Sequence, residues 1–306
     1  TSRLPLQSDE AAWKLLPAEG KDIGKPLPAW AKTLARPLPA TTAAMLRLDY
    51  LHRAASPLDP KLRGKMRWVA AHANRCAYGE AYALADLRRA GVQEKELKVL
   101  MGDPSGWPKA EHDALLFARR LTRSAYLVSD DEVSALIKRH GEKQVVAMVL
   151  LLAYANFQDR LLLTLGLSVE PGGPLAPLDV RPSPKAQASV PTRVLPSPVK
   201  TPLEDLKDPE WAEFDFSALQ LRVDRQRERA GRIRVPAWEE VSRHRPASPP
   251  RKPLRIKWSL VCMGYQPELA AAWSACTGSF GREARQDRVF EESLFWVVTR
   301  SLQCFY

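Results

Sequence analysis

The sequence predicts an all-α fold, and three observations lead to this prediction. Apolar residues recur at helical spacing through most of residues 38–166, proline or capping residues begin several of these segments, and no stretch alternates with period two strongly enough to indicate a sheet. With 306 residues, of which 45% are hydrophobic, the chain is long enough for about two domains. We therefore expect one complete helical bundle, with further helices after it.

The helices of this bundle are predicted from their ends and their apolar faces. The first strong helix is expected over residues 39–52, and Pro60 suits the first position of the next one, where its missing N–H is not needed. Ser129, followed by three acidic residues, indicates a capped helix that ends at Gly141. The last segment, 142–165, is apolar enough to be the central core helix. Its longest apolar run is too short to span a bilayer, which favours a buried helix over a membrane span. Other helices are expected at 76–89, at 93–101 and from Pro108 to about Thr122.

The rest of the chain is divided by its proline content. Residues 1–37 are proline-rich and are expected to be irregular, with a short amphipathic piece around 30–34. Residues 171–202 contain nine prolines, which is typical of an extended, semi-rigid linker, and one charged helix is expected near 216–230. The sequence thus predicts four segments: 1–37, a helical domain at 38–166, a linker with a charged helix at 167–250, and a partial second domain at 251–306.

Composition narrows the partners. The formal net charge is +11, but the basic residues are interspersed with acids and no nucleic-acid-binding motif accompanies them, so we expect no nucleic-acid partner. Four cysteines in a chain of this length are not a disulfide scaffold, which favours reduced thiols in a cytoplasmic protein without membrane attachment. The histidines lack ligand spacing and no glycine-rich phosphate loop occurs, so neither a metal nor another cofactor is expected.

The C-terminal segment resembles the start of the helical domain. A shift of 228 residues places Cys76 on Cys304, and Trp68-Val69 on Trp296-Val297. Pro39 then falls on Pro267, and Ala43-Ala44 on another Ala-Ala pair. The identities are few, but they keep their order over two helices, which favours an internal duplication over chance.

Glu292 and Cys304 are the candidate catalytic residues. They lie twelve residues apart, the acid within an apolar helix predicted over 290–302 and the thiol at its end. A thiol reacts as the thiolate and therefore needs a group that takes its proton. A carboxylate in an apolar environment is suited to that relay because burial raises its pKa. The alternative is a surface acid beside a buried, inert cysteine.

The segment 289–298 followed by Cys304 resembles the signature of the alkylhydroperoxidase D-like (carboxymuconolactone decarboxylase-like) family. That signature has a glutamate, eleven residues, Cys-x-x-Cys, and a histidine four residues further on. By resemblance, Glu292 matches the relay acid and Cys304 the first thiol. The second thiol and the histidine would fall at positions 307 and 311, beyond Tyr306, so we expect a fragment with little activity by itself. A selenocysteine at position 307 and a segment before Thr1 are further expectations.

The residues around Cys76 have the helix pattern of this signature but lack its other reactive side chains. The stretch Asn74-Arg75-Cys76-Ala77-Tyr78 is similar to the carboxymuconolactone decarboxylase-like branch, yet Gly64, Gly79 and Ala83 stand where the relay acid, the second thiol and the histidine belong. The family resemblance extends over roughly 38–166 and 254–306, and it implies an AhpD-like helical bundle, with one full copy and the first helices of a second.

His72 and Glu80 lie four residues before and after Cys76 and could compensate for the lost partners, provided that one helix runs through residue 76. The alternative is a packing domain that pairs with the second copy. His52 and His140 are expected on helix surfaces.

Three functions remain open. The first is a thiol-dependent antioxidant of the peroxidase or peroxiredoxin type, in which Cys304 reacts and Glu292 relays protons. The second is a carboxymuconolactone decarboxylase-like lyase, and the third is a non-catalytic helical interaction protein. The resemblance implies a peroxide or small organic substrate, a thiol or disulfide reductant as partner, and a homo-oligomer.

Overall fold

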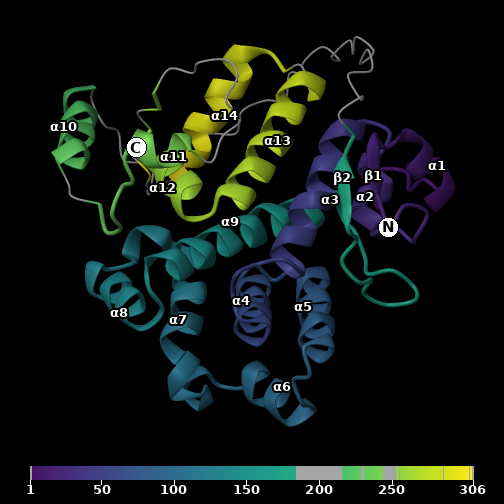
Figure 1. The fold of residues 1–306 in the computed structure, drawn as a ribbon, viewed down its shortest axis with the longest axis horizontal. Helices are drawn as coiled ribbons and strands as arrows, with labels where there is room; N and C mark the ends of the chain where they lie inside the picture. The colour runs from purple at the N-terminus through teal and green to yellow at the C-terminus, as the bar shows by residue number, and fades with distance from the viewer. Residues whose placement is uncertain are drawn as a thin grey trace, which may run out of the picture. The chain divides into compact units, whose positions relative to one another are not determined.

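The computed structural model describes residues 2–183, 216–228, 231–243, 253–254, 256–284, 286–302 and 304. In these residues the fold is all-α, as predicted, with one small sheet (Figure 1). The first nine helices are α1 Asp9–Leu15, α2 Ala29–Leu34, α3 Pro39–Arg53, α4 Pro60–Ala73, α5 Ala77–Arg89, α6 Glu94–Met101, α7 Lys109–Ser124, α8 Asp130–His140 and α9 Glu142–Leu165. The later ones are α10 Phe216–Glu228, α11 Trp238–Ser242, α12 Lys257–Tyr265, α13 Pro267–Ala284 and α14 Arg288–Ser301. The short elements are β1 Ala18–Gly20, β2 Val180–Pro182, and the 3-10 turns η1 Pro104–Gly106 and η2 Ala125–Leu127.

The described residues form two compact units. The first contains residues 2–183 together with the described part of 232–283, and the second contains α10 and α14. The first unit contains Cys76, and the second contains Glu292 and Cys304.

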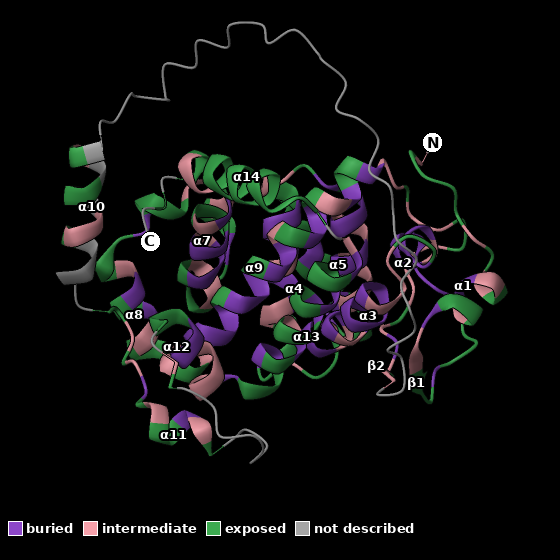
Figure 2. Ribbon diagram, turned by 90° about the horizontal axis from the view of Figure 1, so that it is seen from above, coloured by how far each residue is buried: buried purple, intermediate pink, exposed green. Residues whose placement is uncertain are grey.

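The centre of the first unit is α9. It packs against α4, α7 and α8, and residues such as Met148, Leu152 and Ala155 are fully buried there. In the described residues α9 is the one helix long and apolar enough to cross a membrane, and 67% of its most apolar window is buried inside the unit. Such burial is that of a core helix, and Figure 2 shows α9 largely in the colour of buried residues.

The N-terminal segment is ordered, so the expectation of an irregular stretch over 1–37 is wrong except for the short amphipathic piece expected around 30–34, which is α2. It contains α1, β1 and α2, and Trp30 is 1% exposed. β1 pairs in antiparallel fashion with β2, which lies in the stretch expected to be linker. The sequence did not reveal this sheet because each strand is three residues long and its partner lies far away in the chain. Glu170 joins the two stretches, since its carboxylate accepts a hydrogen bond from the backbone N–H of Ala29 at 2.6 Å.

Helices α12 and α13 belong to the first unit. Leu269 of α13 packs in one cluster with Tyr154 of α9. The carboxylate of Glu283 accepts hydrogen bonds from the N–H groups of Ala40 and Thr41, at 2.7 and 2.8 Å, and from the Thr41 hydroxyl. Glu283 thus caps α3, whose first N–H groups have no partner inside the helix. The sequence places a domain boundary at residue 251, whereas in the structure α12 and α13 lie in the same compact unit as residues 2–183.

Candidate functional site

Cys76 lies in a turn between two helices. Helix α4 ends at Ala73, Arg75 adopts a left-handed conformation with φ of 56°, and Cys76 is the N-cap of α5. The expected helix through residue 76 is therefore broken at this point. The α4–α5 hairpin that results carries positions 64, 76, 79 and 83, which correspond to the reactive residues of the family signature (Figure 1).

His72 and Glu80 meet each other but do not act on the thiol. The Nδ1 atom of His72 lies 3.2 Å from a carboxylate oxygen of Glu80. The His72 ring stacks on the Trp68 ring, with the ring centroids 4.9 Å apart. The side chain of His72 is 63% exposed, whereas Cys76 is 1% exposed. The structure thus gives these two residues a surface contact rather than the role of partners to Cys76.

The surroundings of Cys76 keep its thiol protonated. Burial is the main cause that raises the pKa of Cys76 to about 11, and the charge of Asp159 raises it further, while Arg67 lowers it less strongly. A thiol reacts as the thiolate. Cys76 is therefore a poor nucleophile near neutral pH.

A buried ion pair occupies the space beside Cys76. Asp159, fully buried on α9, accepts hydrogen bonds from Arg67 of α4 at 3.1 Å and from the side chain of Asn74 at 3.0 Å. Arg67 also donates to the side-chain oxygen of Gln158. Sequence reasoning missed this cluster, although an aspartate on the apolar 142–165 helix is a signal, because a buried acid requires a partner.

Gly79 and Gly64, two of these positions, are closely packed against neighbouring side chains. A Cβ atom on Gly79 would lie 2.6 Å from a carboxylate oxygen of Asp159 and 2.9 Å from a guanidinium nitrogen of Arg67. A Cβ atom on Gly64 would lie 2.6 Å from a methyl carbon of Leu87 on α5. A side chain at either position would therefore require the neighbouring side chains to shift.

The backbone turn before Cys304 is similar to the turn before Cys76. The backbone N–H of Cys76 donates to the carbonyl five residues earlier at 2.9 Å, and the N–H of Cys304 does the same at 2.9 Å. The residues that end the two helices also match, with φ and ψ of −82° and −6° at Asn74 and of −91° and 1° at Leu302. Cys304 is exposed, whereas Cys76 and Cys276 are buried and Cys262 is half-buried.

Glu292 does not contact Cys304. Its side chain is 67% exposed, and its nearest charged neighbour is Arg288 at 3.9 Å. At a rise of about 1.5 Å per residue, the helical stretch from Glu292 to Ser301 alone measures roughly 14 Å. Direct proton transfer requires contact near hydrogen-bond distance. The expected carboxylate–thiol contact is thus not formed, and the apolar surroundings expected for the acid are not found, because α14 has no buried residue among those described.

The comparisons with known proteins concern the α3–α7 region. Among the described residues, no group of three or more metal-ligating side chains comes together. Neither a curated protein nor a solved structure matches the chain. Residues 39–120, which run from the start of α3 into α7 and contain the Cys76 turn, match the model of the carboxymuconolactone decarboxylase family.

Proposed function

We propose that the protein is a thiol-dependent oxidoreductase of the peroxidase type and that Cys304 is its reacting residue. The family match supports an AhpD-like or carboxymuconolactone decarboxylase-like kind of function. The observation that carries the finer proposal is the repeated turn: Cys304 has the backbone position of Cys76, but its side chain is exposed, and a peroxide must reach the sulfur to react.

The helix bounds support the duplication on which this assignment rests. α13 begins at Pro267, 228 residues after Pro39 at the start of α3 (267 minus 39). α14 begins at Arg288, again 228 residues after Pro60 at the start of α4 (288 minus 60). The shift that aligns the two cysteines therefore also aligns the two helix starts.

The first copy suggests how Glu292 acts. Gly64 is the residue at the matching position, and its neighbour is Leu87 on α5, the helix that follows the cysteine. By analogy, Glu292 does not contact the sulfur, and the proton passes between them through an intervening group. This arrangement accounts for the long distance between the acid and Cys304.

The reaction begins with the Cys304 thiolate, which attacks one peroxide oxygen. The S–O bond forms as the O–O bond breaks, and the departing alkoxide takes a proton from the relay, which gives a sulfenic acid and an alcohol. A thiol reductant then forms a disulfide with this sulfur and releases water, and a second thiol restores Cys304. Peroxide is the oxidant and the thiol is the reductant, so the cycle closes without a cofactor.

The direct test compares two cysteines that share one turn. Full-length wild type, Cys304→Ser and Cys76→Ser are given cumene hydroperoxide with dithiothreitol, and sulfenic acid is trapped with dimedone and located by mass spectrometry. We expect Cys304→Ser to lose both peroxide consumption and the trapped adduct, and Cys76→Ser to keep both. Equal consumption by wild type and Cys304→Ser, or an adduct on another cysteine only, contradicts the proposal.

The role of Glu292 in proton transfer is tested by comparison with the neighbouring acid, Glu291. Glu291 and Glu292 are adjacent exposed acids on α14. General acid–base catalysis contributes about 10²-fold or more, so Glu292→Gln should lower the rate of peroxide consumption at least tenfold, whereas Glu291→Gln should not. If both variants lose activity equally, Glu292 has no specific role.

The first copy is proposed as a packing module without thiol chemistry. The observation in favour is the tight approach of Gly79 to the Arg67–Asp159 pair, which would have to shift to admit a second thiol. A lyase activity independent of thiols is the alternative, and it predicts turnover of a carboxylated lactone that survives alkylation of the cysteines. If such turnover is lost with Asp159→Asn but kept with Cys304→Ser, the packing role is wrong.

A further inference from the structure

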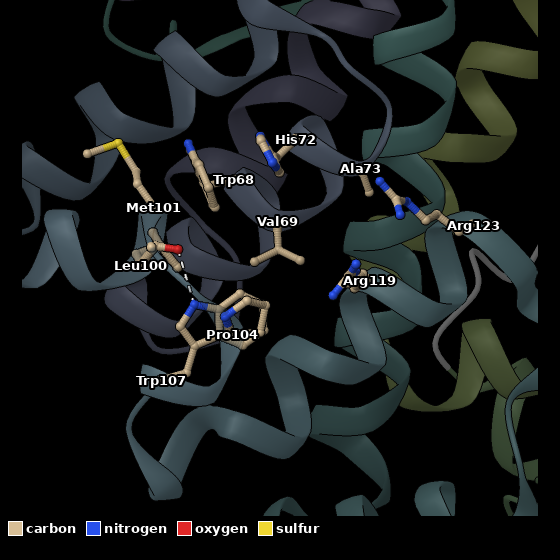
Figure 3. A pocket seen from close by; sticks show the side chains of 11 residues that line it. Trp68, Val69, His72, Ala73, Leu100, Met101, Pro104, Trp107, Arg119 and Arg123 are labelled. Carbon is tan, nitrogen blue, oxygen red and sulfur yellow. Dashed lines mark hydrogen bonds between the residues drawn. The ribbon is translucent and has the colours of Figure 1, made fainter.

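A pocket lies on the side of α4 that faces α6, η1 and α7 (Figure 3). Its volume is about 160 Å³. An apolar cavity of about 150 Å³ is enough for one benzene ring. The buried side chains of Trp68, Val69, Leu100 and Trp107 form much of its wall, and the indole N–H of Trp107 is already bonded to the Leu100 carbonyl at 3.1 Å. The pocket therefore offers a mostly apolar space for a single flat ring.

Two arginines form one side of this pocket. Arg119 and Arg123 lie one turn apart on α7, and Figure 3 shows their guanidinium groups on the side of the pocket opposite Leu100 and Met101. Among the described residues, neither forms an ion pair within 4 Å. Their neighbour Arg120 differs, because it pairs with Glu132 at 2.7 Å. The two guanidinium groups are thus free to bind an anion at the pocket edge.

No carboxylate lines the pocket to neutralise these charges. Asp103 is an acid close enough to Arg119 to be affected by its charge. The pKa of Asp103 is lowered mainly by the hydrogen bonds that it accepts from Ser105 and only slightly by the charge of Arg119. His72 lies over Trp68, and its Nδ1 atom faces Glu80. An uncharged ring would leave the two guanidinium groups without a counter-charge, whereas an inorganic anion would leave the apolar wall empty.

We propose that this pocket binds a small planar monocarboxylate of the size of benzoate. Its ring lies against Trp68 and Val69, and its carboxylate accepts hydrogen bonds from Arg119 and Arg123, for which the guanidinium fork is the matching donor. Neither Cys76 nor Cys304 is among the residues that line the pocket. The inference therefore stands or falls without the proposed thiol chemistry.

The test compares benzoate with benzamide, a neutral molecule of nearly the same shape. Because a ligand of this size binds weakly, binding is followed by ligand-observed NMR titration on the full-length protein. Benzoate should bind and benzamide should bind at least tenfold more weakly. Binding of benzoate should also weaken as salt is raised, since the guanidinium groups are exposed.

Three arginine variants locate the carboxylate. Arg119→Gln and Arg123→Gln should each weaken benzoate binding roughly threefold to tenfold, as expected for charge-assisted bonds near solvent. Arg120→Gln, on the same helix, is the matched control and should leave it unchanged. Ala73→Leu fills the pocket and should abolish binding of both molecules, with the melting temperature as a check on folding. Absence of benzoate binding, equal binding of benzamide, or an equal effect of Arg120→Gln overturns the proposal.

Discussion

Gly79 lies so close to Asp159 that a Cβ atom would stand 2.6 Å from the aspartate carboxylate. This contact joins the start of α5 to the core helix α9 beside Cys76. It places the Arg67–Asp159 pair in the space that a second thiol of the family frame would need.

Restoring the missing cysteine should therefore damage the fold. Gly79→Cys pushes a Cβ atom into the buried pair, and disruption of such a pair costs about 3–5 kcal/mol. We expect the free energy of unfolding, measured by urea denaturation, to fall by about 2–4 kcal/mol. Gly106→Cys is the control, because a Cβ atom there meets nothing within 4 Å. A Gly79→Cys protein as stable as wild type would show that the pair moves aside at little cost.

The buried thiols should make the protein sensitive to alkaline pH. Burial raises the pKa of Cys76 and of Cys276 from 9.0 to about 11 in the folded state. Between pH 9 and 11 the unfolded chain loses protons that the folded chain keeps, so the stability present below pH 9 falls as pH rises. Each thiol should contribute about 2–3 kcal/mol to this loss.

The measurement is the free energy of unfolding at pH 8 and pH 10.5 under reducing conditions. Cys76→Ala should lose less stability between these pH values than wild type does. Cys304→Ala removes an exposed thiol and should reproduce the wild-type loss. An unchanged loss in Cys76→Ala contradicts the burial argument.

His52 should produce the opposite sensitivity, at acidic pH. The sequence suggests a helix-surface histidine, but His52 is 1% exposed and stacks on Tyr154 at 4.5 Å. Burial, with smaller contributions from Arg63 and Arg67, lowers the pKa of His52 from 6.5 to about 3. Below pH 6.5 the unfolded chain takes up a proton that the folded chain refuses, so stability present above pH 6.5 is lost as pH falls towards 3.

At pH 4.5 this loss should reach about 2–3 kcal/mol relative to pH 7. His52→Phe keeps an aromatic ring against Tyr154 and should flatten the dependence measured by urea unfolding. His72→Phe is the matched control, since it removes an exposed imidazole that is also stacked on an aromatic ring. The prediction fails if both variants show the same pH dependence.

A substitution of Glu283 should show how much its hydrogen bonds to α3 stabilise the packing of α13. Its carboxylate accepts three hydrogen bonds at the start of α3, so Glu283→Ala leaves two backbone N–H groups and a hydroxyl without this partner. We expect a loss of about 2 kcal/mol in thermal or urea unfolding. Glu268→Ala, which removes a more exposed acid paired with Arg47, should cost less than about 1 kcal/mol. Equal effects of the two substitutions would mean that the cap does not stabilise the docking of α13.

The helices of the first bundle were predicted well because their signals are local. Pro60 begins α4 and Ser129 caps α8 with Glu132, as the residue types suggest. Periodicity also identified the apolar 142–165 helix as the core. The sheet of β1 and β2 escaped prediction because it depends on pairing between distant segments rather than on local pattern.

The candidate site was predicted less completely. The sequence singled out Cys76, His72 and Glu80 as one group, but the break at Arg75 turned Cys76 inward and left the other two outside. The aspartate on the apolar 142–165 helix signalled that a partner was needed, but the sequence did not identify Arg67 as that partner, because the two residues are 92 positions apart and meet only when α4 packs on α9.

The sequence by itself determined the all-α class and the ends of the main helices, because both depend on residues within a few positions of one another. The tertiary structure alone decided that Cys76 is buried beside an ion pair, that Gly79 lies against this pair, and that α13 belongs to the first unit. Burial and close approach arise from contacts between distant helices, and these contacts set the pKa and the reactivity of each thiol.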